Sequence, residues 1–373
     1  MPLPILVADG RYPGELVVSS NATVYEINPW EFGTFDPTVY GFVPTEYVGS
    51  RFQDGAIPRN ESCVRGFDNG GFVMGTSSTL FNQFFLNVNS TALPDWLKSI
   101  FSDILASIGE DSDDIAVYEP NPFYGWRKDS SPLASQQQLN VVDGGEDLQN
   151  IPLHPLIQTE RHVDVIFAVD SSADTDNSWP NGTALVATYE RSLNSSGIAN
   201  GTAFPVIPDQ NTFVNKGLNA GPTFFGCNST NATGTEGIPP LVVYLPNTPY
   251  VTYSNVSTFA YPSYNNSYRD ILINNGYDAV TLGNGTVDSN WSTCVGCAIL
   301  SRSLERTNTD IPQACTQCFQ KYCWDGSLDS SSPPPYEPTT ALDEVSLDSA
   351  APAVVPTMLS FLVTIAVAVF VAA

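Results

Sequence analysis

The chain has 373 residues, with 39 acidic against 14 basic side chains and a formal charge of -25 at pH 7. This acidity argues against a nucleic-acid partner, which needs a concentrated basic surface, and against polybasic docking on anionic lipid. With 42% hydrophobic and 14% charged residues, the composition is that of one large folded domain or two ordinary ones.

Short apolar runs and amphipathic segments alternate along the chain. Runs rich in β-branched residues predict buried strands over Pro4–Ala8, Val163–Val169 and Leu241–Leu245. Between the first two, apolar residues at three-and-four spacing predict helices over Phe72–Val88 and Leu93–Ile108. Strands that alternate with helices indicate an α/β domain.

Asn-X-Ser/Thr triplets are the most frequent motif. One such triplet arises by chance, but twelve predict a glycosylated protein of the secretory pathway. We therefore expect oxidised cysteines. The triplets begin at Asn21, Asn60, Asn89, Asn181, Asn194, Asn200, Asn228, Asn231, Asn255, Asn265, Asn284 and Asn290.

Two Cys-X-X-Cys pairs, which begin at Cys294 and Cys315, have the spacing of a four-cysteine zinc site. In an oxidising compartment the same spacing favours disulfides, and zinc is the alternative. Seven cysteines is an odd number, so at least one, such as Cys63 or Cys227, has a partner outside the chain or stays free. The cysteines predicted to form disulfides are Cys294, Cys297, Cys315, Cys318 and Cys323.

The two ends of the chain give conflicting evidence about targeting. Residues 354–373 form an uncharged apolar run that follows a Ser/Pro-rich stretch. This order is typical of a cleaved signal for a glycosylphosphatidylinositol (GPI) anchor, with Ser349 as the attachment candidate; a tail-anchored helix is the alternative. The first ten residues lack the basic region of a signal peptide. We therefore expect a fragment, or a chain whose start is placed late.

Histidine is nearly absent, which limits the possible hydrolase chemistries. A Ser-His-Asp triad would have to use His154 or His162, and both are expected to be structural. A serine hydrolase without histidine needs a carboxylate as its base, and Asp143 ends an apolar run directly before two glycines. A turn aspartate is the alternative interpretation. Glu146 and Asp147 could also be imagined as a glycosidase pair.

A family resemblance rests on long strings that include VVDGGEDLQNIPLHPLIQTERHVDVIFAVDSSADTDNSWPNGTAL, NPWEFGTFDPTVYGFVPTEYVGSRF and CVGCAILSRSLERT. Over Met1 to Trp324 the chain resembles the fungal lysophospholipases (phospholipase B), relatives of cytosolic phospholipase A2. The resemblance implies a patatin-like α/β core and hydrolysis of the acyl esters of lysophospholipids and phospholipids, without a metal or organic cofactor. It also implies a glycosylated protein that is secreted or GPI-anchored at the cell surface.

The resemblance implies a serine in a Gly-X-Ser-X-Gly elbow, paired with an aspartate that corresponds to Asp143. No residue of this chain matches the nucleophile, because the segment around Ser77 ends in threonine where the elbow has glycine. Ser77 is therefore expected to be a structural helix residue, and Arg161 cannot be placed by motif. The elbow, the oxyanion glycines and the catalytic arginine belong to an N-terminal half that this chain lacks, so the core is expected to be incomplete there.

The expected organisation has three parts. Residues 1–325 form the C-terminal portion of a lysophospholipase catalytic domain, with a cysteine-rich end at 294–323. An unfolded stalk follows over 326–349, and the hydrophobic anchor signal covers 350–373. The expected partners are lysophospholipid and phospholipid substrates and, through the anchor, a membrane. The chain alone is expected to be inactive. The alternative is a non-catalytic, GPI-anchored cell-surface glycoprotein.

Overall fold

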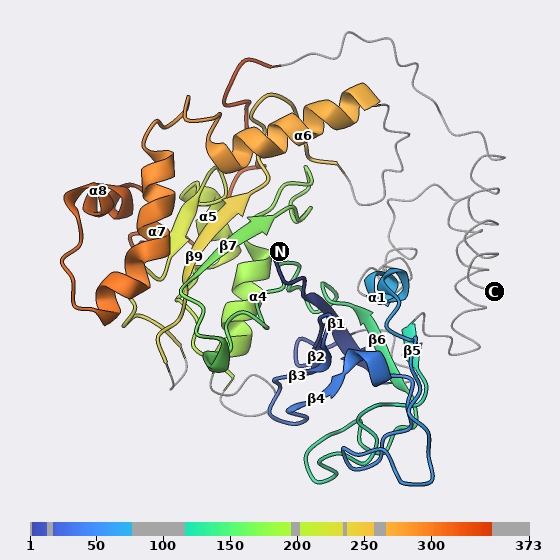
Figure 1. The fold of residues 1–373 in the computed structure, drawn as a ribbon. Coiled ribbons are helices and arrows are strands. Elements are labelled where there is room, and N and C mark those ends of the chain that lie inside the picture. Colours follow the sequence, from blue (N-terminus) through green and yellow to red (C-terminus); the bar gives the residue numbers. More distant parts are fainter. Residues whose placement is uncertain are drawn as a thin grey trace, which may run out of the picture.

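The computed structural model describes residues 2–12, 18–76, 116–194, 202–233, 237–256 and 266–344. Figure 1 shows two separate sheets in this part of the chain, with helices gathered around the second one. The strand predicted at Pro4–Ala8 is observed slightly later, as β1 (Leu6–Arg11). Of the predicted helix over Phe72–Val88, the described portion is α1 (Gly70–Thr76), and Leu93–Ile108 lies outside the described residues.

The first sheet has six strands in the order β4-β3-β2-β1-β6-β5, and each pairing between them is antiparallel. An aromatic cluster fills its core, where the ring centroids of Tyr25 and Phe32 are 5.6 Å apart and those of Tyr25 and Phe123 are 5.5 Å apart. Besides β1, the strands are β2 (Val24–Ile27), β3 (Glu31–Thr34), β4 (Gly41–Pro44), β5 (Ala116–Tyr118) and β6 (Leu139–Asp143).

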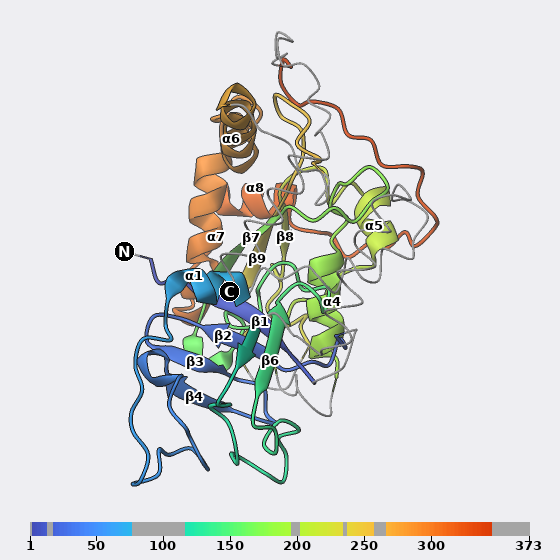
Figure 2. The ribbon, with the colours of Figure 1, turned by 90° about the vertical axis from the view of Figure 1, so that its right-hand side faces the viewer.

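The second sheet confirms the two other predicted strands. It consists of β7 (Val165–Asp170), β9 (Leu241–Pro246) and β8 (Thr223–Phe225) in the order β7-β9-β8, as Figure 2 shows. β7 and β9 are parallel, and β8 is antiparallel to β9.

Helices cover β9 on both faces. α4 (Thr183–Ser192) packs on one face, and α7 (Trp291–Arg306) and α8 (Gln313–Tyr322) pack on the other. This layering explains why the β9 sequence is continuously apolar: all six of its residues are buried. The remaining helices are α5 (Gln210–Asn215) and α6 (Asn266–Thr281), with short 3₁₀ turns at Thr45–Tyr47 and Thr159–Arg161.

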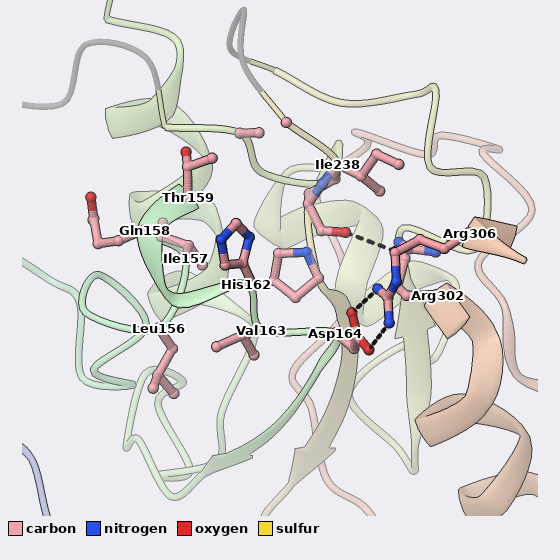
Figure 3. Close-up of a pocket in the computed structure, with 14 residues that line it drawn as sticks. Leu156, Ile157, Gln158, Thr159, His162, Val163, Asp164, Ile238, Arg302 and Arg306 are labelled. Carbon is pink, nitrogen blue, oxygen red and sulfur yellow. Dashed lines mark hydrogen bonds and ion pairs between the residues drawn. The ribbon is translucent and has the colours of Figure 1, made fainter. Parts of the chain in front are cut away.

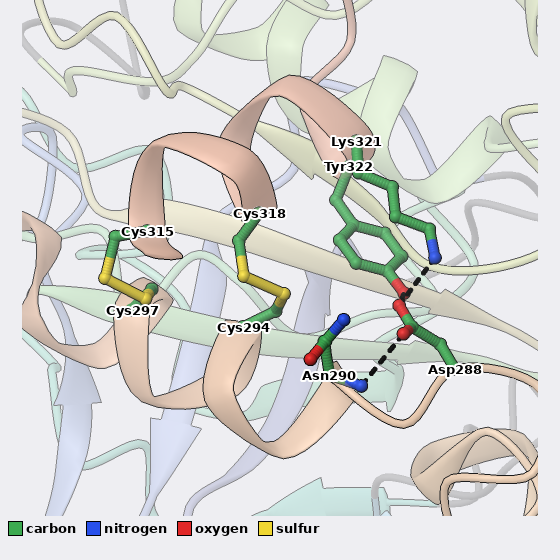
Figure 4. Close-up of a disulfide and its surroundings, with 8 residues drawn as sticks. All are labelled: Asp288, Asn290, Cys294, Cys297, Cys315, Cys318, Lys321 and Tyr322. Carbon is green, nitrogen blue, oxygen red and sulfur yellow. Dashed lines mark hydrogen bonds and ion pairs between the residues drawn. A yellow bond between two sulfur atoms is a disulfide. The ribbon is translucent and has the colours of Figure 1, made fainter. Parts of the chain in front are cut away.

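Three disulfides hold the cysteine-rich end together. Cys294–Cys318 and Cys297–Cys315 join α7 to α8 (Figure 4). Cys227–Cys323 joins the end of β8 to the end of α8. The predicted disulfide state is therefore observed, and the cysteines with zinc-like spacing bond to one another across the two helices. Of the two cysteines left open by the sequence, Cys227 is paired, whereas Cys63 is exposed and free.

A buried acidic residue connects α8 to the loop before α7. Asp288 accepts hydrogen bonds from Lys321 Nζ at 2.6 Å, from Tyr322 Oη, and from the Asn290 backbone N–H at 2.9 Å (Figure 4). Burial alone would raise the pKa of Asp288, but the hydrogen bonds from Lys321 and Tyr322 outweigh burial and lower it to about 2. This cluster and the two disulfides fix α8 against α7.

The C-terminal stretch lies along the domain in the part that the structure describes. The Ala341 and Leu342 backbone N–H groups donate to the Pro249 and Tyr250 carbonyls at 3.1 and 2.9 Å. Asn215 Nδ2 donates to backbone carbonyls near residue 330. This packing differs from the unfolded stalk that the Ser/Pro-rich composition predicted. Ser349 and the apolar run 354–373 lie outside the described residues, and within the described ones no helix is long and apolar enough to span a membrane.

A buried ion pair ties the two sheets together. Arg191 on α4 donates to both carboxylate oxygens of Asp36 at 3.0 and 3.1 Å and to the Ser20 and Ala22 carbonyls at 3.0 Å. Asp36 is fully buried and also accepts from the Val24 backbone N–H at 2.7 Å. The pair therefore links the helix that packs on the second sheet to the strand connections of the first.

We expect the disulfides to make a large contribution to stability. Replacing Cys294 and Cys318 together with alanine opens a bridge that spans 24 residues, and we expect the free energy of unfolding to fall by about 3 kcal/mol. Denaturant unfolding measures this change. Cys63→Ser is the matched control and should leave the unfolding midpoint unchanged; an unchanged midpoint in the double variant would contradict the role of the bridge.

The buried carboxylates predict that stability depends on pH. Burial raises the pKa of Asp9 and Asp147, and it raises that of Asp36 to about 7. In the folded chain Asp36 keeps its proton up to about pH 7, whereas in the unfolded chain it releases that proton near about pH 4, so the free energy of unfolding falls as pH rises through that window. The raised pKa values of Asp9 and Asp147 act in the same direction. The lowered pKa of His154 acts in the opposite direction below about pH 6.5.

Thermal unfolding at pH 5.5 and 7.5 tests this prediction, and the midpoint should be lower at pH 7.5. In Asp36→Asn the difference between the two midpoints should shrink, whereas in Asp129→Asn, which changes an exposed carboxylate, it should not. A midpoint that rises between pH 5.5 and 7.5 would rule out this account.

Candidate functional site

Asp143 is the last residue of β6 and is half-buried where that strand leaves the sheet beside Ala8 of β1. The Gly145 backbone N–H donates to Asp143 Oδ1 at 2.8 Å, which fixes the orientation of the carboxylate. Burial raises the pKa of Asp143, and the Gly145 hydrogen bond only partly offsets that rise. A carboxylate with a raised pKa is a better proton acceptor than an exposed one.

The two glycines after Asp143 are required by close contacts. A Cβ on Gly144 would lie 2.6 Å from the Val7 carbonyl oxygen, and one on Gly145 would lie 2.2 Å from Asn150 Oδ1. A side chain at position 144 would collide with backbone, and one at position 145 would displace the Asn150 amide. The glycines thus allow the chain to turn tightly against β1 and bring the Gly145 N–H to the carboxylate.

The loop after Asp143 is anchored to both sheets. The Asp147 backbone N–H donates to Asp9 Oδ2 on β1 at 3.2 Å, and Thr188 Oγ1 on α4 donates to Gln149 Oε1 at 3.1 Å. Asp147 accepts from the Gln149 backbone N–H at 2.9 Å. These contacts hold the loop at the junction between the sheets.

A further set of hydrogen bonds joins this loop to the carboxyl end of β7. Asn150 Nδ2 donates to Ser172 Oγ at 3.0 Å, and the Ser172 backbone N–H donates to Asp170 Oδ1 at 2.9 Å. Tyr244 on β9 donates to Asp170 Oδ2 at 2.7 Å. The carboxyl edge of parallel strands is where open α/β sheets bind their ligands. Sequence reasoning missed Asn150 and Ser172, although Ser172 stands just after a predicted strand.

The acidic neighbours of Asp143 have structural roles. Asp147 is buried and accepts a hydrogen bond from the Gln149 backbone N–H. Its Oδ2 lies 3.9 Å from Arg191 Nη1. Glu146 is also buried. A glycosidase needs two carboxylates that both face a sugar bond, so this arrangement does not favour that alternative.

Neither histidine lies in a contact with Asp143. His154 is buried with Nε2 3.3 Å from Asp36 Oδ1, and burial together with the charge of Arg191 lowers its pKa well below the ordinary value. It is therefore a neutral structural histidine. His162 is exposed and lies at the other end of β7.

Arg161, which the sequence could not place, forms an ion pair with Glu26 and stacks over the Phe35 ring at 5.2 Å. Its charge is therefore used within the fold. Ser77 lies outside the described residues. No cluster of three or more potential metal ligands occurs within the part of the chain that the structure describes.

A cavity of about 540 Å³ lies at the opposite, amino end of β7 and β9 (Figure 3). In this cavity Arg306 forms a bidentate ion pair with Asp164. Arg302 donates to the Pro239 and Gly226 carbonyls at 2.9 and 2.7 Å. Both arginines are thus occupied by groups of the protein. The cavity is separate from the loop that carries Asp143.

Most of the described glycosylation triplets are accessible. Three asparagines are half-buried, namely Asn181, Asn194 and Asn255. Six others are exposed: Asn21, Asn60, Asn228, Asn231, Asn284 and Asn290. The remaining three, Asn89, Asn200 and Asn265, lie outside the described residues.

Comparisons with known proteins agree with the resemblance seen in the sequence. Lysophospholipase 1 of Aspergillus fumigatus is 72% identical over 358 residues, which cover 96% of this chain and 55% of that protein. A lysophospholipase of Penicillium chrysogenum is 60% identical and is covered over 59% of its length. Lysophospholipase 1 of Saccharomyces cerevisiae is 50% identical over 89% of this chain and 50% of that protein. The chain therefore spans about half the length of these curated relatives.

Among solved structures, human GIVD cytosolic phospholipase A2 is similar with a TM-score of 0.42 and 14% identity, over 86% of this chain and 45% of that one. The family model of the lysophospholipase catalytic domain matches residues 1–329. With that match and with relatives at 50 to 72% identity, the chain belongs to the lysophospholipase catalytic domain family.

Proposed function

We propose that this chain supplies the base of a lysophospholipase that hydrolyses fatty-acyl esters of lysophospholipids and diacyl phospholipids. The observation that carries the proposal is the orientation of the Asp143 carboxylate, which accepts a hydrogen bond of 2.8 Å from the Gly145 N–H. The loop that follows Asp143 is hydrogen-bonded to Ser172, just after the carboxyl end of β7. The names of the relatives support the substrate class. The serine nucleophile would come from polypeptide outside this chain.

In the proposed reaction, Asp143 accepts the proton of the serine hydroxyl as the serine oxygen attacks the acyl carbonyl. The proton then passes to the glycerol oxygen that leaves, and the acyl group remains on the serine as an ester. A water molecule, deprotonated by the same carboxylate, attacks this ester. Asp143 then returns the proton to the serine oxygen as the bond between that oxygen and the acyl carbon breaks, and the fatty acid is released. The raised pKa of Asp143 favours the two steps in which it accepts a proton, first from the serine and then from the water.

We propose further that the protein is a glycosylated, cell-surface protein held by a lipid anchor at Ser349. Six exposed triplets and three disulfides support passage through the secretory pathway. The anchor rests on the order of a polar stretch, small residues and an apolar run in the sequence.

Asp143→Asn tests the proposed base in a protein of the relatives' full length, made by joining this chain to the part of Aspergillus fumigatus Lysophospholipase 1 that it does not match. We expect hydrolysis of lysophosphatidylcholine to fall by about 100-fold or more, since an amide cannot accept the proton, while the unfolding temperature stays close to that of the parent. Asp129→Asn, an exposed substitution, is the control. Near-normal turnover in Asp143→Asn would sink the assignment.

The chain as printed should not hydrolyse lysophosphatidylcholine. Asp143 can accept a proton from a positioned hydroxyl but cannot replace that hydroxyl, and without oxyanion donors the transition state loses its main electrostatic support. An assay of the purified chain, beside its Ser77→Ala variant, decides the point. Turnover that this substitution abolishes would identify Ser77 as a nucleophile and overturn the prediction.

A further inference from the structure

The Asp143 carboxylate is oriented by a backbone turn. Asp143 Oδ1 accepts the Gly145 N–H at 2.8 Å, and among the described residues no other hydrogen bond reaches this carboxylate. The Glu146 N–H donates to the Asp143 carbonyl at 3.1 Å, so residues 143–146 form one tight turn. One carboxylate oxygen is thus held by the turn, and the other is left to accept a proton.

This turn contains two glycines in a row, which makes it easy to deform, because glycine has more backbone conformations open to it than other residues. The Asn150 side-chain amide supports the turn from outside. A Cβ on Gly145 would lie 2.2 Å from Asn150 Oδ1 and 3.2 Å from Asp143 Oδ1. The amide therefore lies directly against Gly145, on the side where the held carboxylate oxygen also lies.

Asn150 is exposed, so its side chain needs a partner to keep one rotamer. That partner is Ser172, which is 5% exposed and whose Oγ accepts from Asn150 Nδ2 at 3.0 Å. In the part of the chain that the structure describes, this is the only hydrogen bond of the Asn150 side chain. The position of the amide thus depends on Ser172.

Ser172 is in turn fixed from inside the second sheet. Its backbone N–H donates to Asp170 Oδ1 at 2.9 Å, and Asp170 Oδ2 accepts from Tyr244 Oη at 2.7 Å. Both Asp170 and Tyr244 are fully buried. A shift of Ser172 would leave a buried carboxylate short of a donor, which is costly. Ser172 is therefore as firmly placed as the core of the sheet.

We propose that Ser172 and Asn150 are positioning residues for Asp143. Ser172 holds the Asn150 amide against Gly145, and the amide keeps the Gly145 N–H directed at Asp143 Oδ1, so that Oδ2 faces the serine nucleophile. The inference rests on the proposed function, since a base must be aligned with the hydroxyl that it deprotonates. Both residues act through the turn and do not touch the reacting atoms.

Kinetics of the full-length protein that joins this chain to the unmatched part of Aspergillus fumigatus Lysophospholipase 1 test the proposal. In Asn150→Ala and in Ser172→Ala, kcat for lysophosphatidylcholine should fall by about 10-fold or more, and KM should change by less than about twofold, because a misaligned base slows the chemical step. Ser172→Thr keeps the hydroxyl and should recover most of the loss. The double variant should lose no more than the larger single loss, because the two residues act as one unit.

The pH profile separates positioning from a general loss of structure. The Gly145 hydrogen bond lowers the pKa of Asp143 against the effect of burial. Weakening that bond should therefore raise this pKa and move the acid limb of kcat/KM upward by about half a pH unit. A partly unfolded variant would lose activity without moving the limb. The charged groups on the elements packed around Asp143 stay the same in both variants: Asp9 on β1, Glu146 and Asp147 on the loop, Asp170 on β7 and Arg191 on α4.

Asn177→Ala is the matched control. Asn177 lies in the same loop after β7, and its Nδ2 donates to the Tyr336 carbonyl at 3.1 Å, so the variant loses a similar hydrogen bond. It should keep the parent's kcat and acid limb. As a measurement that needs no activity, the Gly145 amide of the chain as printed should exchange its hydrogen faster in Asn150→Ala and Ser172→Ala than in the parent, and at the parent's rate in Asn177→Ala.

An unchanged Gly145 exchange rate would refute the proposal, and so would a kcat that stays at the parent's value in Asn150→Ala and Ser172→Ala. A fall in kcat without a move of the acid limb, or losses that add up in the double variant, would leave the two residues a structural role only. Retained turnover in Asp143→Asn would instead remove the proposed function, and the Gly145 exchange rate would still decide whether Ser172 and Asn150 hold the turn. The two failures are therefore distinguishable.

Discussion

The ion pair between Arg191 and Asp36 is the contact on which the arrangement of the two sheets depends. Both groups are buried, and Arg191 also satisfies two carbonyls of the connection between β1 and β2. A buried pair of this kind contributes little net stability compared with apolar packing, but leaving either charge alone costs several kcal/mol. The pair therefore selects one relative placement of the sheets, because any other placement would leave a buried charge without its partner.

That placement produces the candidate site. The loop after Asp143 is tied to β1 through Asp9, to α4 through Thr188, and to the end of β7 through Ser172. None of these contacts is local in sequence, so the orientation of the Asp143 carboxylate depends on both sheets at once. The base that we propose would need such rigid support, since proton transfer tolerates little misplacement.

The sequence predicted the features that depend on local pattern. The strands β7 and β9 follow from continuous apolar runs, and the tight turn after Asp143 follows from its two glycines. The oxidised state of the cysteines follows from the glycosylation triplets. It did not predict the antiparallel six-stranded sheet, whose strands β2, β3 and β4 have four residues each and are too short to give a clear period. Asn150 and Ser172 were also missed, because their roles arise from a contact across 22 residues. The Ser/Pro-rich composition after residue 326 suggested an unfolded stalk. In the structure, backbone N–H groups of this stretch donate to carbonyl groups of the domain, and composition alone does not reveal such partners.

The disulfide between Cys227 and Cys323, at a sequence separation of 96, closes a covalent ring that includes β9, α6, α7 and α8. A single proteolytic cut anywhere inside that ring leaves both new ends attached to the same molecule. The nicked chain can then keep β9 between β7 and β8, since no strand of the second sheet is released. Such a ring turns a break in the backbone into an event that the fold can survive.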